Sequence, residues 1–244
     1  MNARDIGKLL DSFLARYDTS EKDAVWQIQS RNFRTFWEQR IMAGGEKELN
    51  DLEIDEIVRI LDRNGKGNKP NTEAVARAMI PQGAWRRLFN EIKSRNPLSR
   101  ALNTAFTAKD ASTRAEAIDM IYKINAGKRN NLTGKSGNAI NAMLAAYDPL
   151  NNLSVISLND RRKLIEFFAF DGSPDFDKDS MGRKITVSQS CILSGFKELE
   201  ITANARTLSV FLYSPGVESL WKIKEGPPPD PPIEPDSSGD KSLF

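Results

Sequence analysis

The sequence predicts an all-α protein, an irregular globule of about ten helices with a Pro-rich C-terminal tail. Apolar residues recur three and four positions apart through most of the chain, which is helical spacing. Ser, Thr, Asp and Asn stand before several of these segments, where they would cap helices. Six of the twelve prolines fall in residues 225–244, beside five acidic residues and one lysine, so this segment cannot pack a core.

The domain organisation follows from length and composition. The chain has 244 residues, of which 39% are hydrophobic and 28% charged, which is ordinary for a soluble protein with a sizeable core. We expect one helical globule over residues 1–224, with a division into 1–69 and 70–224 as an alternative, and a disordered acidic linker or tail at 225–244. No stretch approaches the roughly 20 apolar residues of a membrane span, and the N-terminus lacks the apolar core of a signal peptide. The sequence therefore predicts a cytoplasmic protein.

Periodicity and capping residues define the elements of the first half. Residues 3–16 and 21–42 predict two amphipathic helices, and the aromatic stripe of the second suits a core face, with a base-stacking platform as the alternative. The further helices predicted here lie around residues 51–61 after Asn50, 75–80 after the cap Asn71-Thr72-Glu73, 82–92 after Pro81, 98–106 after Asn96-Pro97, and 111–124 after Lys109-Asp110.

The second half begins with an Ala-rich helix that opens after the turn at residues 132–137 and stops at Asp148-Pro149. The apolar run at 153–156 is the one strand candidate. The remaining predicted elements are a basic-headed helix from residues 157–160, an acidic loop at 171–179, helices at 185–200 and from 202–204 onward, and a last turn at 214–221. The three alternating aspartates of the loop could ligate a cation, but a solvated loop is the preferred interpretation.

The chain contains no histidine and one cysteine, and this excludes most catalytic chemistry. Without histidine there is no Ser-His or Cys-His nucleophile and no usual zinc site, so a metal would need carboxylates. Cys191 stands in an apolar helical context, which indicates a buried hydrophobic residue rather than a nucleophile. We therefore expect no cofactor, no metal and no catalytic residue.

The centre of the chain is basic although the net charge is only +2. Residues 81–135 hold eleven Lys and Arg against four Asp and Glu, a local balance of 11 − 4 = +7. The Gly-rich turn at 127–137 leads into a helix, where free backbone N–H groups and the helix dipole attract phosphate. The candidate nucleic-acid contacts are Lys128, Arg129, Lys135, Ser136 and Asn138, with Arg161, Arg162 and Lys163 nearby and Arg86, Arg87 and Arg95 extending the patch.

The triplet Gly134-Lys135-Ser136 does not make a nucleotide-binding phosphate loop, because Arg129 stands where the first glycine is needed and no strand precedes it. The wider turn, Leu132-Thr133-Gly134-Lys135-Ser136 with Gly137, resembles that of the helix-hairpin-helix DNA glycosylase family, in which Leu-Pro-Gly-x-Gly leads into an Ala-containing helix. The resemblance covers about 40 residues and implies duplex binding. It places the catalytic aspartate of the family near residues 157–160, and Asp160 is the candidate.

Residues 142–163, with Ala-Met-Leu, Asp-Pro and Leu-Ser-Val-Ile-Ser-Leu-Asn-Asp-Arg-Arg-Lys, are similar to helical accessory regions of bacterial restriction and modification-dependent defence proteins. In those proteins a helical sensor is tethered to a motor or nuclease, and the Pro-rich tail fits this arrangement. A nuclease motif is missing from the sequence, since no Pro-Asp is followed by Glu-x-Lys.

The leading hypothesis is a non-catalytic nucleic-acid-binding module, with DNA favoured, that serves as the sensor of a restriction or antiviral defence system. The alternative is a helical scaffold that docks a protein partner, or leads to a downstream domain, through residues 225–244. A third hypothesis is a glycosylase-like enzyme that uses Asp160.

Overall fold

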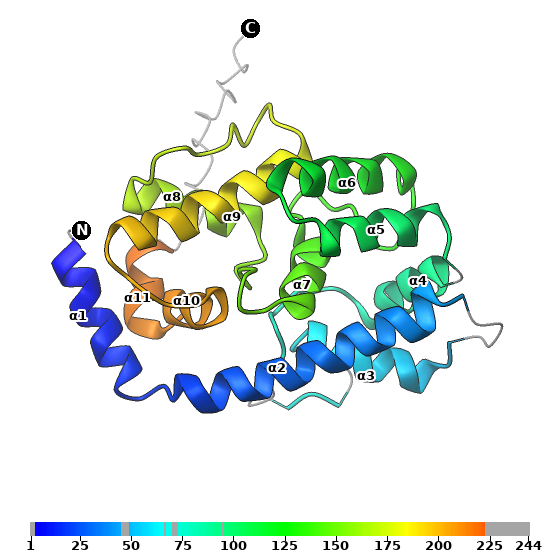
Figure 1. The fold of residues 1–244 in the computed structure, drawn as a ribbon, viewed down its shortest axis with the longest axis horizontal. Helices are drawn as coiled ribbons and strands as arrows, with labels where there is room; N and C mark the ends of the chain where they lie inside the picture. Colours follow the sequence, from blue (N-terminus) through cyan, green and yellow to red (C-terminus); the bar gives the residue numbers. More distant parts are fainter. Residues whose placement is uncertain (1–2, 45–48, 66, 70–72, 94, 223–244) are drawn as a thin grey trace, which may run out of the picture.

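The computed structural model describes residues 3–44, 49–65, 67–69, 73–93 and 95–222, and this part of the chain is all-helical, as predicted (Figure 1). Its elements are α1 (Ala3–Leu14), α2 (Thr19–Phe36), the π-helix η1 (Trp37–Met42), α3 (Asp51–Leu61), α4 (Gln82–Ile92), α5 (Pro97–Thr107), α6 (Ala111–Ile124), α7 (Asn138–Tyr147), α8 (Leu158–Phe168), α9 (Met181–Glu198), α10 (Ala205–Leu212) and α11 (Pro215–Trp221). The tail at 225–244 lies outside the described residues.

The predicted capping residues begin the helices where the sequence places them. Asn50 and Glu53 form a reciprocal capping box at the start of α3. Asp110, Ser157 and Asn204 each accept a hydrogen bond from the backbone N–H three residues ahead, at α6, α8 and α10. These local bonds satisfy amides that a helix start leaves unpaired, and they explain why these four helix starts were predictable. Helix α9 instead begins at Met181, after the cap Ser180 and four residues before its predicted start.

The long helix α2 continues into η1 and runs along one side of the molecule beneath α7 and α10 (Figure 1). The aromatic residues Trp26, Phe33 and Trp37 on this helix are completely buried. The aromatic stripe is therefore a core face, which confirms the favoured prediction, and the base-stacking alternative is wrong.

Residues 73–80 do not form the predicted helix. This segment is extended and pairs in parallel with the end of α3, through a bridge between Asp62 and Ala76 and a bond from Val75 N to Ile60 O at 2.8 Å. The completely buried Asp62 carboxylate accepts from Ala78 N at 3.1 Å and from Ile80 N at 3.2 Å. These long-range bonds replace the helical bonds that the local spacing of apolar residues suggested. The first two residues of the predicted cap, at 71–72, lie outside the described residues.

The apolar run at 153–156 is buried but does not form a strand in the described structure. Ser154 N donates to Ser209 Oγ at 2.9 Å, so a side chain on α10 takes the place of a neighbouring strand. The run crosses the interior between α7 and α8.

Two clusters of buried apolar side chains form the core. The larger gathers α2 to α7 and extends from Trp26 to Ile185, so residues on both sides of position 69 contribute to it. The second gathers α1 and α8 to α11, including Ile6, Phe196 and Phe211. Helix α9 packs on α6 at one end and on α8 at the other, and thereby joins the two clusters.

Candidate nucleic-acid interface

The turn between α6 and α7, residues 125–137, is a rigid corner with a packed inner side. Asn125 and Asn130 are buried and exchange amide hydrogen bonds at 3.0 and 2.8 Å, and Leu132 is completely buried. Tyr122 on α6 donates to Gly134 O at 2.7 Å. These hydrogen bonds therefore anchor the inner side of the corner, and its outer side exposes Lys135, Lys128 and Arg129.

Helix α4 packs against the outer edge of this corner and brings further cations to it. Arg87 Nε donates to Arg129 O at 3.1 Å. Lys128 Nζ lies 2.7 Å from Glu91 Oε1, while the other oxygen of Glu91 accepts from Asn130 at 2.9 Å. Three exposed cations (Arg87, Lys128 and Arg129) thus lie where α4 meets the corner, and Lys128 pairs there with the half-buried Glu91.

The exposed amide cradle expected at the start of α7 is not formed. Gly137 has a φ of 69° and lets the chain turn sharply into the helix, and no side chain caps this end. However, Ala139 is 1% exposed and Ile140 is 0% exposed, so the first helical turn faces the core. The expectation was wrong because the Ala-rich sequence suits a helix buried on all sides.

Asn138 is not a free phosphate donor, whereas the half-buried Ser136 is held through its backbone. The carbonyl of Ser136 accepts from Leu158 N at 3.0 Å, which ties the corner to the start of α8. Asn138 Nδ2 donates to Ala78 O at 3.3 Å, and its Oδ1 is buried without a partner.

The three basic residues at the start of α8 have different surroundings. Arg161 is completely buried and donates to Val155 O at 2.7 Å and Ile185 O at 2.9 Å, so its assignment as a nucleic-acid contact was wrong. Arg162 is exposed but pairs with carboxylates of Glu166 and Asp177. Lys163 is half-buried and also has an interaction partner.

Arg86 and Arg95, the other two predicted contacts on the α4 side, differ in their surroundings. Arg86 is half-buried between Asp51 at 3.1 Å and Asp55 at 2.9 Å, so its charge is neutralised within the protein. Arg95 is exposed beyond the C-terminal end of α4. The structure therefore brings Arg87 next to Lys128 and Arg129 of the predicted patch, and it exposes Lys135 on the same turn.

A cavity of about 900 Å³ opens beside the corner, and sequence reasoning missed most of its residues. Asn138 lies at its edge. Five cations line it against two acids: Arg16, Arg63, Arg77, Arg206 and Lys222 against Asp160 and Glu218. These residues come from the end of α1, the bridged segments, α8, α10 and α11. No local motif could have revealed them, because only the fold brings them together.

Asp160, the residue that the glycosylase resemblance singled out, lies at the α11 end of this cavity. Its Oδ2 accepts from Tyr213 OH at 2.7 Å and is 3.8 Å from Lys222 Nζ. Burial, together with the charge of Asp160, raises the pKa of Tyr213 well above its usual value. The phenol therefore stays protonated and keeps donating to the carboxylate.

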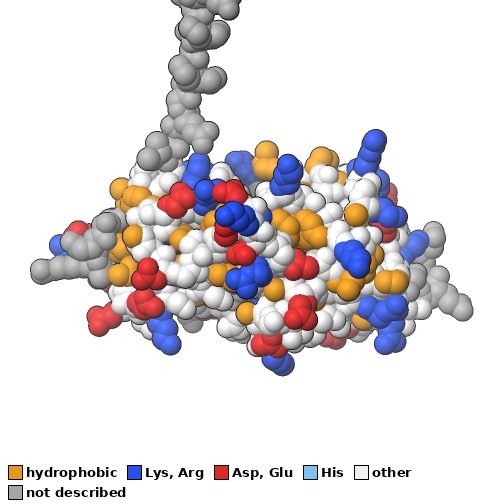
Figure 2. Space-filling model, turned by 90° about the horizontal axis from the view of Figure 1, so that it is seen from above, with side chains coloured by type: hydrophobic (Ala, Val, Ile, Leu, Met, Phe, Trp, Pro, Cys, Tyr) orange, Lys and Arg blue, Asp and Glu red, His pale blue; other side chains and the backbone are white. Residues whose placement is uncertain are grey.

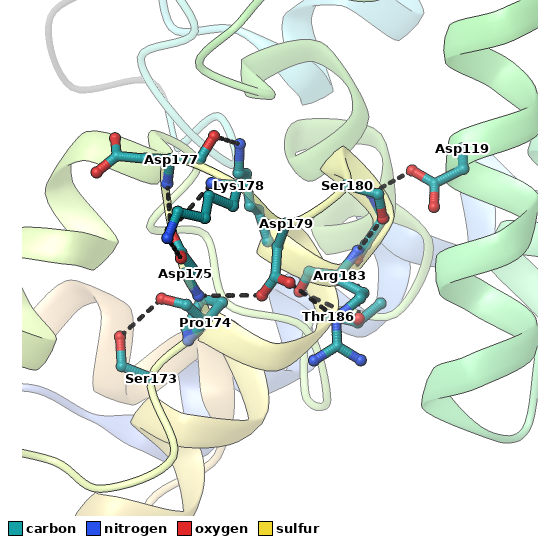
Figure 3. A network of polar contacts seen from close by, with 12 residues as sticks. Asp119, Ser173, Pro174, Asp175, Asp177, Lys178, Asp179, Ser180, Arg183 and Thr186 are labelled. Carbon is teal, nitrogen blue, oxygen red and sulfur yellow. Dashed lines mark hydrogen bonds and ion pairs between the residues drawn. The ribbon is translucent and has the colours of Figure 1, made fainter.

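The acidic loop before α9 uses its aspartates to hold its own backbone (Figure 3). Asp175 Oδ1 accepts from Asp177 N and Lys178 N, at 3.0 and 2.9 Å. Asp179 accepts from Asp175 N at 3.0 Å and from Arg183 Nε at 3.2 Å.

On the face at the top of Figure 1, acidic and basic side chains are interspersed rather than forming a field of one sign (Figure 2).

Within the described residues, no three His, Cys, Asp or Glu side chains are grouped closely enough to hold a metal ion. None of the helices in that part of the chain has the length and apolar character needed to cross a membrane.

No protein-family model, curated protein or solved structure matches this chain.

Proposed function

We propose that the protein is a non-catalytic nucleic-acid-binding module that contacts the phosphate backbone of DNA through Arg87, Lys128, Arg129 and Lys135. The observation that carries the proposal is the packing of α4 on the corner, since it brings the exposed Arg87 next to Lys128 and Arg129, with Lys135 exposed on the same turn. Cations clustered on one surface attract phosphate without reading base sequence.

The rigidity of the corner supports this function. The buried Asn125–Asn130 pair and the Tyr122 bond fix the backbone that carries Lys128, Arg129 and Lys135. A surface that is already ordered loses little conformational entropy when a ligand binds. The Lys128–Glu91 ion pair can open at little cost, because the Lys128 side chain is 54% exposed and such pairs are weak.

The proposed biological setting comes from sequence likeness alone. The similarity of residues 142–163 to accessory regions of defence proteins favours a sensor role in a restriction system in the cytoplasm. In this proposal, residues 225–244 lead to a partner or a downstream domain.

The test is a salt titration of duplex binding by the triple variant Lys128→Gln, Arg129→Gln, Lys135→Gln. We expect weaker binding to blunt 5′-hydroxyl duplex DNA, and a slope of log affinity against log salt that falls by about 0.9 for each phosphate that the protein no longer neutralises. The matched control is Lys178→Gln, Arg183→Gln, Lys197→Gln, which removes the same charge from exposed positions elsewhere. The control should bind as the unaltered protein does.

Two results would reject the proposal. One is the absence of duplex binding by the unaltered protein at low salt. The other is an equal loss of affinity in both triple variants, which would mean that net charge rather than the corner controls binding.

A further inference from the structure

Arg206 of α10 lines the cavity beside the corner, and its buried guanidinium forms no ion pair with any described carboxylate. Arg206 is 6% exposed and lies over the Trp26 ring, with 4.2 Å between Cζ and the ring centroid. One of its terminal nitrogens donates to Val75 O at 2.7 Å and to Ser154 Oγ at 3.0 Å, while Nε is buried with no partner. Among the described residues, no carboxylate forms an ion pair with it. Burial lowers the pKa of Arg206 to about 10, so it remains charged at neutral pH.

Three more arginines converge on the same cavity from its rim. Arg63 and Arg77 are exposed and make no ion pair with any described residue, and Arg16 Nε donates only to the Ser12 carbonyl, at 3.3 Å. After burial, the largest effects on the pKa of Arg206 are those of Tyr17 and Glu73, which raise it, and the charge of Arg63 lowers it by less. Nearby Glu73 forms its ion pair with Lys22, at 2.6 Å.

This arrangement is unfavourable in the absence of a ligand. A buried charge is normally paired, and like charges that share a site destabilise it. An anion that accepts hydrogen bonds from several guanidinium groups would remove both penalties. Phosphate suits this geometry, since arginine binds its oxygens with two parallel donors.

The wall next to these arginines is aromatic. Phe13 and Tyr17 stack with 4.8 Å between ring centroids, and both line the cavity. Stacking on such rings is the usual way in which proteins bind a nucleobase without reading its identity. The volume of about 900 Å³ is typical of a small-molecule site.

We propose that this cavity binds a nucleoside phosphate carrying at least two negative charges. Arg206, Arg63 and Arg77 hold the phosphate, and Tyr17 with Phe13 packs against the base. The site is separate from the four cations of the DNA interface, and the proposal does not depend on that function. The shared chemistry is a phosphate ester, which could be a free nucleotide or the 5′-phosphate end of a DNA strand.

The experiment is calorimetric titration of the full chain with the four common ribonucleoside monophosphates and triphosphates, with inorganic phosphate, and with unphosphorylated nucleosides. We expect at least one nucleotide to bind, inorganic phosphate to bind more weakly, and nucleosides not to bind. The variant Arg63→Gln, Arg77→Gln alters exposed side chains and should weaken nucleotide binding by at least about tenfold. The control Arg100→Gln, Arg183→Gln removes the same charge outside the cavity and should change nothing.

A second variant distinguishes the contribution of the base to binding from that of the phosphate. Tyr17→Leu should weaken nucleotide binding while leaving inorganic phosphate binding unchanged, because it removes only the stacking surface. A 5′-phosphorylated oligonucleotide that binds more tightly than its 5′-hydroxyl counterpart, through Arg63 and Arg77, would identify a DNA end as the source. Binding of free nucleotides without that difference would identify a metabolite.

The proposal is overturned if millimolar nucleotide produces no heat and no thermal stabilisation, or if the Arg63, Arg77 variant binds as the unaltered protein does. Its failure is distinguishable from failure of the DNA interface. The corner triple variant should retain nucleotide binding, and the Arg63, Arg77 variant should retain binding to 5′-hydroxyl duplex DNA.

Discussion

Arg161 and Arg206 are two buried guanidinium groups with different surroundings. Arg161 donates to two carbonyls and to Ser188 Oγ, so protein acceptors surround it. Arg206 leaves Nε without a partner and borders a cavity. Burial lowers the pKa of each to about 10. The fold satisfies the first arginine, whereas the second keeps an unpaired nitrogen beside a cavity, as the anion site proposed above requires.

Replacing Arg161 by Lys tests its structural role. A lysine keeps the charge but cannot satisfy both carbonyls, so Arg161→Lys should lower the free energy of unfolding by at least about 2 kcal/mol. Denaturation in urea measures the change. The control is the exposed neighbour Arg162→Lys, which should stay within about 0.5 kcal/mol of the unaltered protein. Equal midpoints for the two variants would contradict a structural role.

At the level of elements, α6 and α9 touch backbone to backbone. A Cβ added to Gly182 would lie 2.0 Å from Ala115 O, and Gly182 N donates to Asp119 on α6 at 2.7 Å. The absence of a side chain at this position therefore sets how closely α9 can approach α6. Since α9 joins the two core clusters, this contact affects both.

Gly182→Ala should force α6 and α9 apart and destabilise the protein by about 2 kcal/mol or more. Gly7→Ala is the matched control, because Gly7 lies within α1 and has open space around it. That control should stabilise the protein by about 0.5–1 kcal/mol through the better helix propensity of alanine. Thermal unfolding measures both variants, and a change in the same direction for the two would contradict the close-contact explanation.

Elements were predictable from sequence where local signals determine them. Capping by Asn50, Asp110 and Ser157 is a matter of three or four neighbouring residues, and the helix starts were predicted correctly. The extended segment at 73–80 was not predicted, because its amides bond to Asp62, up to 18 positions earlier in the chain. Apolar spacing alone does not distinguish such a segment from a short helix.

At the level of the whole molecule, the residues of the two proposed binding surfaces were predictable only where they are neighbours in sequence. The corner cations are neighbours in sequence, so part of that surface was predictable, while the contribution of Arg87 depends on how α4 packs. The burial of Arg161 could not be predicted, since it depends on Ile185 and Ser188 of α9. The arginines of the cavity come from segments up to 190 positions apart, between Arg16 and Arg206 (206 − 16), and only the fold assembles them.

All four tyrosines have a raised pKa, mainly because of burial, and the effect is largest for Tyr122 and Tyr213. Each folded phenol holds its proton more tightly than in the unfolded chain. The stability that the tyrosines contribute is therefore complete below about pH 10 and is lost as the pH rises through their folded pKa values. In an alkaline titration followed by phenolate absorbance, we expect little ionisation at pH 10 in the native protein and about half in urea. Ionisation of most tyrosines at pH 10 without unfolding would contradict this prediction.

The completely buried Asp62 carboxylate links several parts of the molecule. It accepts from the backbone of the 73–80 segment and from Trp85 Nε1 on α4, at 3.3 Å. That segment carries Arg77 into the cavity and provides the Ala78 carbonyl that receives Asn138 of α7. The segment is also packed in the core, since Ala74, Val75 and Ala78 are at most 2% exposed, so it cannot detach without exposing core side chains. A loss of the Asp62 carboxylate would therefore disturb one wall of the arginine-lined cavity together with the core behind it.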